Sequence, residues 1–269
     1  MSIVALAIVT LLAAVMVASR HQWTWAAPAT RRWDRLVPVL RAYVRCSPAT
    51  FTYLFILAIT TWVLRSSTVT VDRQLLLEHS TSLGRLKHDP VSVLLTSAFW
   101  VTPYELWLWL GLFPLVLAPT ERWLGSIRMI VVFFVGHIGA TLLAAATITF
   151  MIRHAWAPRR LRDVIDVGSS YGFWCVAALF SYRLPPPWRW AWIASILVGA
   201  LAFIAWRTSF SDYGHLLAIL IGLALYPLTR APSVQVRRSW PIWRPPALMI
   251  DLEVERIEAR RRLEAGMDA

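Results

Sequence analysis

Seven long runs of apolar residues constrain this chain more than any other feature. They lie at residues 3–19, 49–64, 91–117 (broken by Pro103), 127–152, 167–184, 190–206 and 213–228. Each of the last four can cover most of a hydrocarbon core of ~30 Å at 1.5 Å per residue. With 58% hydrophobic and 16% charged residues, the chain has too little polar surface for a soluble globular or disordered protein. We therefore predict an all-α, polytopic membrane bundle.

The polar segments predict three regions and an orientation. Residues 1–47 hold the first run and a basic segment, residues 48–229 a transmembrane core, and residues 230–269 a Pro-rich extended linker and a charged helix. The first run is either an extra anchor helix or an uncleaved leader, since no basic residue precedes it. Placing the basic segment and the tail in the cytoplasm puts 18 of the 27 basic residues there. We expect a multi-pass protein of the cell membrane with a cytoplasmic tail.

The charge and the cysteine content limit the classes of partner and cofactor that we expect for this chain. The net charge of +12 is spread between apolar runs, so it indicates topology and lipid headgroup contact rather than nucleic-acid binding. Cys46 and Cys175 lie far apart in different segments, which provides neither a metal-binding spacing nor a disulfide framework. We expect no metal, no cofactor and no nucleic acid.

Ionisable residues inside apolar runs are functional candidates because their burial in a membrane is costly. They are Glu105, Glu121, His137, Asp166, Asp212 and His215. Asp166 is a candidate N-cap, with Gly168 allowing close approach of backbone and Ser170 following one turn into the helix. Gly168, Ser169 and Gly172 alone are most simply small packing residues of a helix contact.

His215 lies on the face formed by Ala218 and Gly222, a small-residue pattern that brings helices together. Asp212, one turn earlier, is placed to hold its ring. In the predicted topology Ser170 and His215 lie at similar depth near the external face, which suggests a nucleophile and its base. A lone histidine in a membrane is more often a structural, hydrogen-bonded residue.

These residues resemble the rhomboid superfamily of intramembrane serine proteases over roughly residues 50–228. The matching segments are Leu94-Leu-Thr-Ser-Ala-Phe-Trp100, Glu121-Arg-Trp-Leu-Gly125, Gly168-Ser-Ser170 and His215-x-x-Ala218-x-x-x-Gly222. The resemblance implies a six-helix core, Ser170 as nucleophile, His215 as base and Trp174 as an aromatic packed on the histidine. It also implies structural roles for Glu121 and Gly125, and transmembrane protein substrates or clients as partners.

Three departures from the family pattern leave the activity open. Tyr171 replaces the glycine after the nucleophile, while Glu105 and Trp109 stand where active members carry an oxyanion-binding His and Asn. Losing one oxyanion donor typically costs about 10²–10³ in rate. The chain is therefore either a protease or a pseudoprotease that binds transmembrane clients or lipids. A small transporter or proton relay is a lesser alternative, since the sequence lacks an inverted repeat; it would use Glu105, His137, Asp166, Asp212 and His215.

Overall fold

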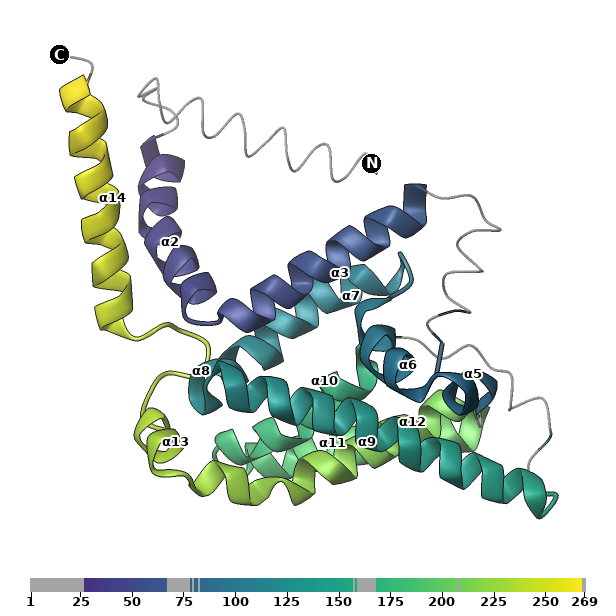
Figure 1. Cartoon of the computed structure of the whole chain (residues 1–269). Helices are drawn as coiled ribbons and strands as arrows, with labels where there is room; N and C mark the ends of the chain where they lie inside the picture. Colours follow the sequence, from purple (N-terminus) through teal and green to yellow (C-terminus); the bar gives the residue numbers. More distant parts are fainter. Residues whose placement is uncertain are drawn as a thin grey trace. The chain divides into compact units, whose positions relative to one another are not determined.

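A computed structural model describes residues 27–66, 78, 80–81, 83–156, 158, 168–207 and 209–267 (Figure 1). The chain divides into two compact units, which we describe separately. One comprises residues 47–243, and the other joins the residues up to Cys46 to those from Arg244 onward. Every regular element in the described ranges is helical, which confirms the all-α prediction. The run at residues 3–19 and Asp166 lie outside the described residues.

Four helices in the described residues are long and apolar enough to cross a membrane. They are α3 (Pro48–Ser66), α9 (Ser126–Arg153), α11 (Trp188–Arg207) and α12 (Phe210–Ala224), the last continued by a 3₁₀ turn, η6 (Tyr226–Arg230). Two further segments of the core are irregular. One joins α7 (Glu105–Leu112) through a π-helical turn, η3 (Phe113–Leu117), to α8 (Ala118–Leu124), and the other is α10 (Ser170–Phe180). Neither is among the four helices of the described residues that are long and apolar enough to cross a membrane.

The third apolar run is two elements rather than one. Its first part forms α6 (Pro90–Thr96) and η2 (Ser97–Phe99), preceded by α5 (Leu83–His88). Pro103 then stands in the turn before α7. Because a proline disfavours helical backbone in the residue before it, the run cannot continue as one straight helix.

The fifth run is shorter than predicted, and its N-cap is Ser169 instead of Asp166. Ser170 is consequently the first residue of α10 and not one turn inside it. The eleven residues of α10 span about 16 Å, far less than a hydrocarbon core of about 30 Å. A short 3₁₀ turn, η5 (Ser181–Arg183), follows it.

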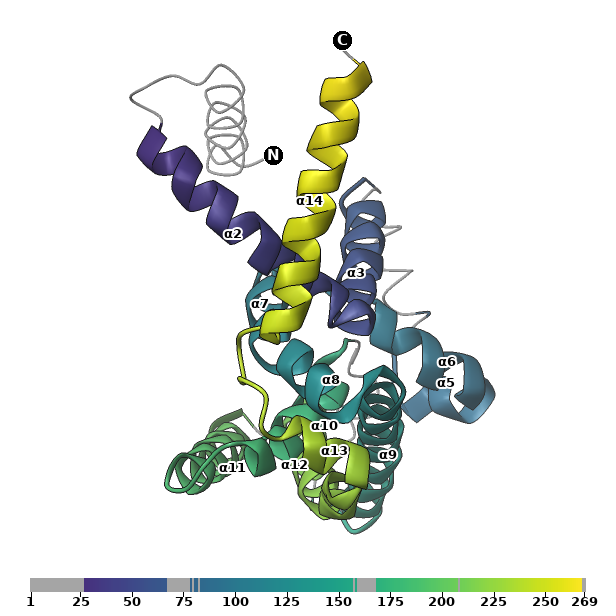
Figure 2. The same ribbon diagram turned by 90° about the vertical axis from the view of Figure 1, so that its left-hand side faces the viewer.

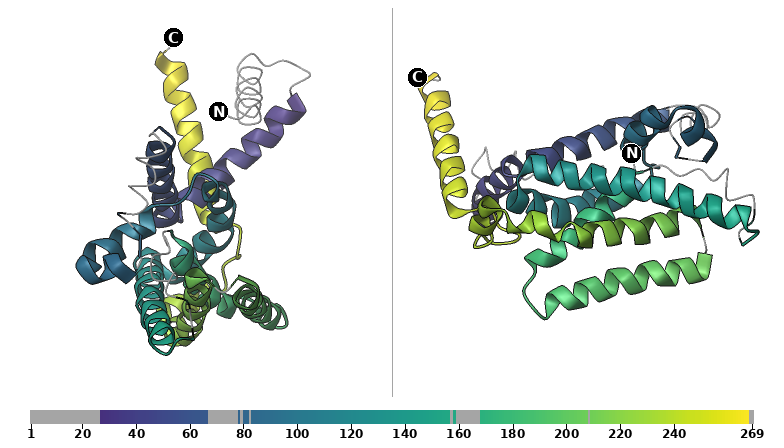
Figure 3. Two further views of the ribbon diagram at one scale, coloured as in Figure 1. Left: turned by 90° about the vertical axis from the view of Figure 1, so that its right-hand side faces the viewer. Right: turned by 60° about the horizontal axis from the view of Figure 1, so that its bottom comes forward.

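α10 lies at the centre of the bundle, packed along α9 and α12. Figure 2 shows α11 on one side, α9 on the other, and α10 with α12 between them. The right-hand view of Figure 3 shows α11 running beside α12. Glycines permit the closest contacts: a Cβ at Gly136 would come within 2.1 Å of the Cys175 Cβ, and one at Gly222 within 2.1 Å of the Cys175 carbonyl oxygen.

Glu121 fixes the start of α3 through its buried carboxylate. Its oxygens accept hydrogen bonds from the backbone N–H of Ala49 and Thr50, both at 2.8 Å, and from the hydroxyls of Thr50 and Ser126, both at 2.7 Å. A carboxylate at a helix N-terminus satisfies N–H groups that have no partner within the helix. Gly125 ends α8 with φ +90°, which a residue with a Cβ adopts only under strain.

The segment after the last pass differs from the extended linker predicted there. Residues Pro232–Arg237 form α13, which packs against α8. Val234 is fully buried in this contact region and belongs to the main apolar cluster of the core. Pro232 occupies the first turn of α13, where its missing N–H costs nothing. Pro232 therefore begins a helix here and does not mark an extended linker.

The second unit pairs α2 (Ala27–Arg45) with α14 (Ala247–Met267), which run antiparallel. Two interhelical ion pairs set their register: Arg45 with Glu253 at 3.0 Å and Arg261 with Asp34 at 2.9 Å. Glu253 is 1% exposed and also pairs with Arg256 at 2.7 Å. The charged tail helix that the sequence predicts is thus present and is longer than the charged stretch itself.

Candidate functional site

Ser170 and His215 meet at the contact between α10 and α12. The Ser170 Oγ lies 3.0 Å from the His215 Nε2, which is hydrogen-bonding distance. Both residues are half-buried, whereas their neighbours Ser169 and Gly214 are buried. The pair combines a hydroxyl with a proton acceptor at the geometry required of a nucleophile and its general base.

Tyr171 lies beside the pair and does not separate it. Its ring is 2% exposed and meets the His215 ring edge-on, with centroids 5.4 Å apart. Space for the phenol comes from Gly214, where an added Cβ would lie 2.2 Å from the Tyr171 ring. The bulky residue is thus matched by a glycine on the facing helix. Sequence reasoning missed Gly214, and its position directly before His215 was the available signal.

Trp174 lies one turn after Ser170, as the family resemblance implied. Its ring centroid is 6.2 Å from that of His215, farther than the Tyr171 ring. Trp174 also packs edge-on against Phe173, at 5.4 Å. The histidine therefore has two aromatic neighbours on α10, and Tyr171 is the nearer one.

Ser97 and His137 form a second serine–histidine pair, which is fully buried. The Ser97 Oγ lies 3.0 Å from the His137 Nε2, and the two side chains are 0% and 1% exposed. The Ser97 carbonyl also accepts a hydrogen bond from the Gly168 N–H at 3.0 Å. This network ties η2, α9 and the start of α10 together at Gly168, whose φ of +128° requires a glycine. His137 is an interhelical hydrogen-bonding residue, and Ser97 was not singled out in the sequence.

Asp212 closes a capping box at the start of α12. Its Oδ2 accepts hydrogen bonds from the Ser209 N–H at 2.9 Å and from the Ser209 hydroxyl at 2.7 Å, and its N–H donates to the Ser209 Oγ. The carboxylate is thereby engaged one turn before His215, at the end of the helix where negative charge is favourable. Asp212 thus supports the helix that carries His215, and the predicted contact of its carboxylate with the imidazole ring stays a prediction.

Glu105 and Trp109 lie on α7 and have structural partners. The Glu105 Oε2 accepts a hydrogen bond from the Thr102 N–H at 3.0 Å, which caps the start of α7. Trp109 is 5% exposed and packs against Phe113 and Phe173, with ring centroids 5.2 and 5.3 Å away. The Trp109 ring thus links α7 to α10 three residues after Ser170.

Ala218 and Gly222 lie on the face of α12 that meets α10. Ala218 is fully buried, and Gly222 lies against the backbone of Cys175. This close approach is what brings His215, on the same face one turn earlier, to Ser170. In the described ranges, no three His, Cys, Asp or Glu side chains are grouped so that they could hold a metal ion.

Comparison with known proteins gives one finding. The family model described as rhomboid-like protein matches residues 42–235, which is most of the chain and all six segments of the core. No curated protein and no solved structure gives a significant match. With its helical membrane bundle and the matched range together, the chain belongs to the family of rhomboid-like proteins and is an integral membrane protein.

Proposed function

We propose that this rhomboid-like protein is an intramembrane serine endopeptidase with Ser170 as nucleophile and His215 as general base. The observation that carries the proposal is the distance of 3.0 Å between the Ser170 Oγ and the His215 Nε2. Such a pair needs a peptide carbonyl and water, and both residues are half-buried and not sealed in the core. Transmembrane proteins are the substrates that a site on a short central helix would receive.

The reaction follows from the roles of the two side chains. His215 Nε2 takes the hydroxyl proton as the Ser170 Oγ attacks the peptide carbonyl carbon, and the same proton then passes to the leaving amine nitrogen. A water molecule attacks the resulting ester, with its proton taken by His215 and returned to the Ser170 Oγ when the acid leaves. Both half-reactions restore the starting enzyme.

The oxyanion is stabilised mainly by the start of α10. Ser170 and Tyr171 occupy its first turn, where backbone N–H groups point out of the helix and favour negative charge. Glu105 and Trp109 supply no donor equivalent to a His and Asn pair. Because each missing oxyanion donor costs about 10²–10³ in rate, we expect a slow enzyme.

The test is labelling of the full-length protein in proteoliposomes with a fluorophosphonate probe. We expect covalent labelling that is lost in Ser170→Ala. Labelling should also be strongly reduced in His215→Ala, because the serine needs the histidine as its base. Ser169→Ala is the matched control, because it removes the hydroxyl of the adjacent, buried serine and should leave labelling intact. An unlabelled wild type, or labelling that persists without His215, would overturn the proposal.

A pseudoprotease is the second candidate, and one observation favours it. An apolar cavity of about 380 Å³ is lined mainly by residues of α3, η2 and α9, among them Ile56, Phe99 and Phe134. A transmembrane client could be held there without any hydrolysis. A defined transmembrane peptide that binds wild type and Ser170→Ala equally, and is never cut by either, would favour this candidate over the protease.

A further inference from the structure

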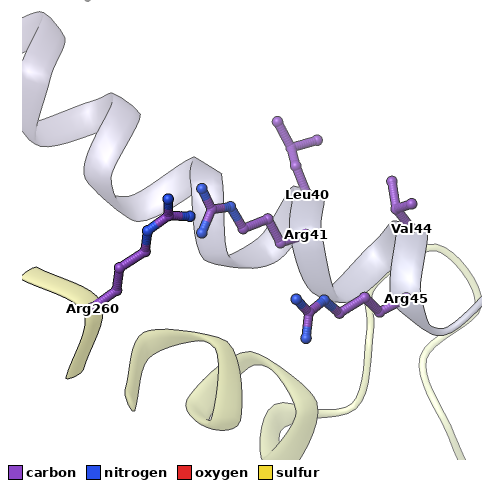
Figure 4. Close-up of a pocket in the computed structure, with 5 residues that line it drawn as sticks. All are labelled: Leu40, Arg41, Val44, Arg45 and Arg260. Atoms are coloured by element: carbon purple, nitrogen blue, oxygen red, sulfur yellow. The ribbon is translucent and has the colours of Figure 1, made fainter. Parts of the chain in front are cut away.

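The unit formed by α2 and α14 carries a basic cavity outside the proposed catalytic site. Its volume is about 400 Å³, and it is lined by Leu40, Arg41, Val44, Arg45 and Arg260. Figure 4 shows the guanidinium groups of Arg41, on α2, and Arg260, on α14, pointing toward each other. Guanidinium groups are suited to binding anions, because each presents several N–H donors in a fixed plane. The lining thus favours a negatively charged ligand.

Beside the cavity, α2 exposes an apolar stripe. Leu36, Leu40 and Val44 follow one another at intervals of four residues, with exposed fractions of 52%, 53% and 43%. The opposite side of the helix, including the buried Pro38 and Ala42, faces inward. An arginine-rich helix with one unpartnered apolar stripe is typical of segments that lie in the plane of a membrane surface.

The chain itself keeps α2 near a membrane. Only Cys46 and Ser47 separate the end of α2 at Arg45 from the start of the membrane-crossing helix α3 at Pro48. Three peptide steps cover at most about 11 Å. The C-terminal half of α2, with Leu40, Arg41 and Val44, is therefore close to the headgroup layer, where phosphates are the abundant anions.

We propose that the cavity binds the phosphate of an anionic phospholipid, whose acyl chains lie against Leu36, Leu40 and Val44. Arg41 and Arg260 hold the phosphate oxygens, a task for which the planar guanidinium is suited. Arg45 borders the cavity while remaining paired with Glu253 at 3.0 Å, so this ion pair fixes its position at the edge of the site. The site combines basic and apolar linings, as an intact lipid requires and a free phosphate ion does not.

The test measures binding of a short-chain phosphatidylglycerol to the full-length protein in neutral detergent, with the matching phosphatidylcholine as reference. We expect tighter binding of phosphatidylglycerol and a weakening of about fivefold for each arginine removed in Arg41→Gln/Arg260→Gln, the factor for one basic residue beside anionic lipid. The matched control is Arg31→Gln/Arg262→Gln, which removes the same charge from the same two helices outside the cavity. It should bind like the wild type.

Three results would overturn the proposal. The first is equal binding of the two lipids, and the second is an equal loss in the two double variants. The third is displacement of phosphatidylglycerol by an equal concentration of inorganic phosphate, which would assign the cavity to a free anion.

A dye attached at Leu40→Cys in a Cys46→Ser background gives a second readout. Its emission should shift to the blue in nanodiscs that contain phosphatidylglycerol, and a shift independent of lipid charge contradicts the proposal.

Discussion

At the scale of single residues, Tyr171 and Gly214 determine whether His215 can reach Ser170. The tyrosine fills the space that a small residue leaves at the preceding position on α12, and its ring supports the imidazole edge-on at 5.4 Å. Its other side faces His137, with centroids 6.2 Å apart. Since Tyr171 is buried between these neighbours, it has no free direction in which to move if Gly214 acquires a side chain.

Gly214→Ala should therefore destabilise the protein and weaken the serine–histidine contact. Overpacking of a filled site costs about 1–3 kcal/mol, and we expect lower thermal stability in detergent together with reduced fluorophosphonate labelling. Tyr171→Ala removes the clashing ring, so the double variant should be little worse than Tyr171→Ala alone. Gly199→Ala on α11 is the control, because nothing lies within 4 Å of its added Cβ. Additive losses in the double variant would contradict this explanation.

The sequence predicted the position of a residue where helical spacing alone determines it. It did not predict a role that depends on a contact between two helices. The three-residue step from His215 to Ala218 placed the histidine on the packed face, and the structure brings it to Ser170. The role of Gly214 depends on the side chain facing it, which no spacing along one helix reveals. Ser209 also donates a hydrogen bond to the Asp212 carboxylate, a contact that the sequence analysis did not predict.

At the scale of elements, the start of α3 depends on a carboxylate from α8. Glu121 is 1% exposed and accepts four hydrogen bonds, two of them from backbone N–H groups in the first turn of α3. The family resemblance implied a structural role for Glu121 without naming its partners. Ser126 is one partner, but the N–H groups come from α3, some 70 residues earlier, and such a long-range contact leaves no local pattern.

Glu121→Gln should weaken the contact between residue 121 and the first turn of α3. An amide has one acceptor oxygen where the carboxylate has two, and hydrogen bonds to a charged group are worth about 1.5–3 kcal/mol. We expect a loss of stability in this range, measured by unfolding in mixed detergent. Glu258→Gln on α14 is the control: its side chain is 57% exposed, and its ion pair with Arg262 is long at 3.8 Å. That change should cost less than about 1 kcal/mol. Equal effects of both changes would show that Glu121 is not a structural cap.

The contact of α12 with α10 gives a second prediction at this scale. A Cβ at Gly222 would meet the Cys175 carbonyl oxygen at 2.1 Å, and backbone cannot yield as a flexible side chain can. Gly222→Ala should push the helices apart, lengthen the distance from Ser170 to His215 and lower fluorophosphonate labelling more than it lowers protein yield. At Gly139 the added Cβ meets only the end of the Ile221 side chain at 3.1 Å, so Gly139→Ala is the matched control. Labelling unaffected by Gly222→Ala would separate this contact from the site.

At the scale of the whole molecule, the pairing of α2 with α14 limits the topology. α2 precedes the first pass of the core, α14 follows the last, and the two helices share ion pairs. Helices that pack together in one unit lie on one side of the membrane, so the number of passes between them is even. The four described helices that are long and apolar enough to cross a membrane satisfy this condition, as do the six core passes that the sequence predicts. The irregular backbone of η3 and the shortness of α10 could not be predicted from hydropathy.

The orientation is the last prediction: the excess of arginine in the α2 segment and the tail predicts that both lie in the cytoplasm. In sealed cells, a membrane-impermeant thiol reagent should label Glu78→Cys, in the segment between α3 and α5, but neither Arg32→Cys nor Glu258→Cys until the membrane is permeabilised. The parent carries Cys46→Ser, and its buried Cys175 gives the background. Labelling of all three sites in the opposite pattern would reverse the orientation and place Ser170 toward the other face. Labelling of Arg32→Cys and Glu258→Cys from opposite sides would exclude the pairing of α2 with α14, because no even number of passes separates such ends.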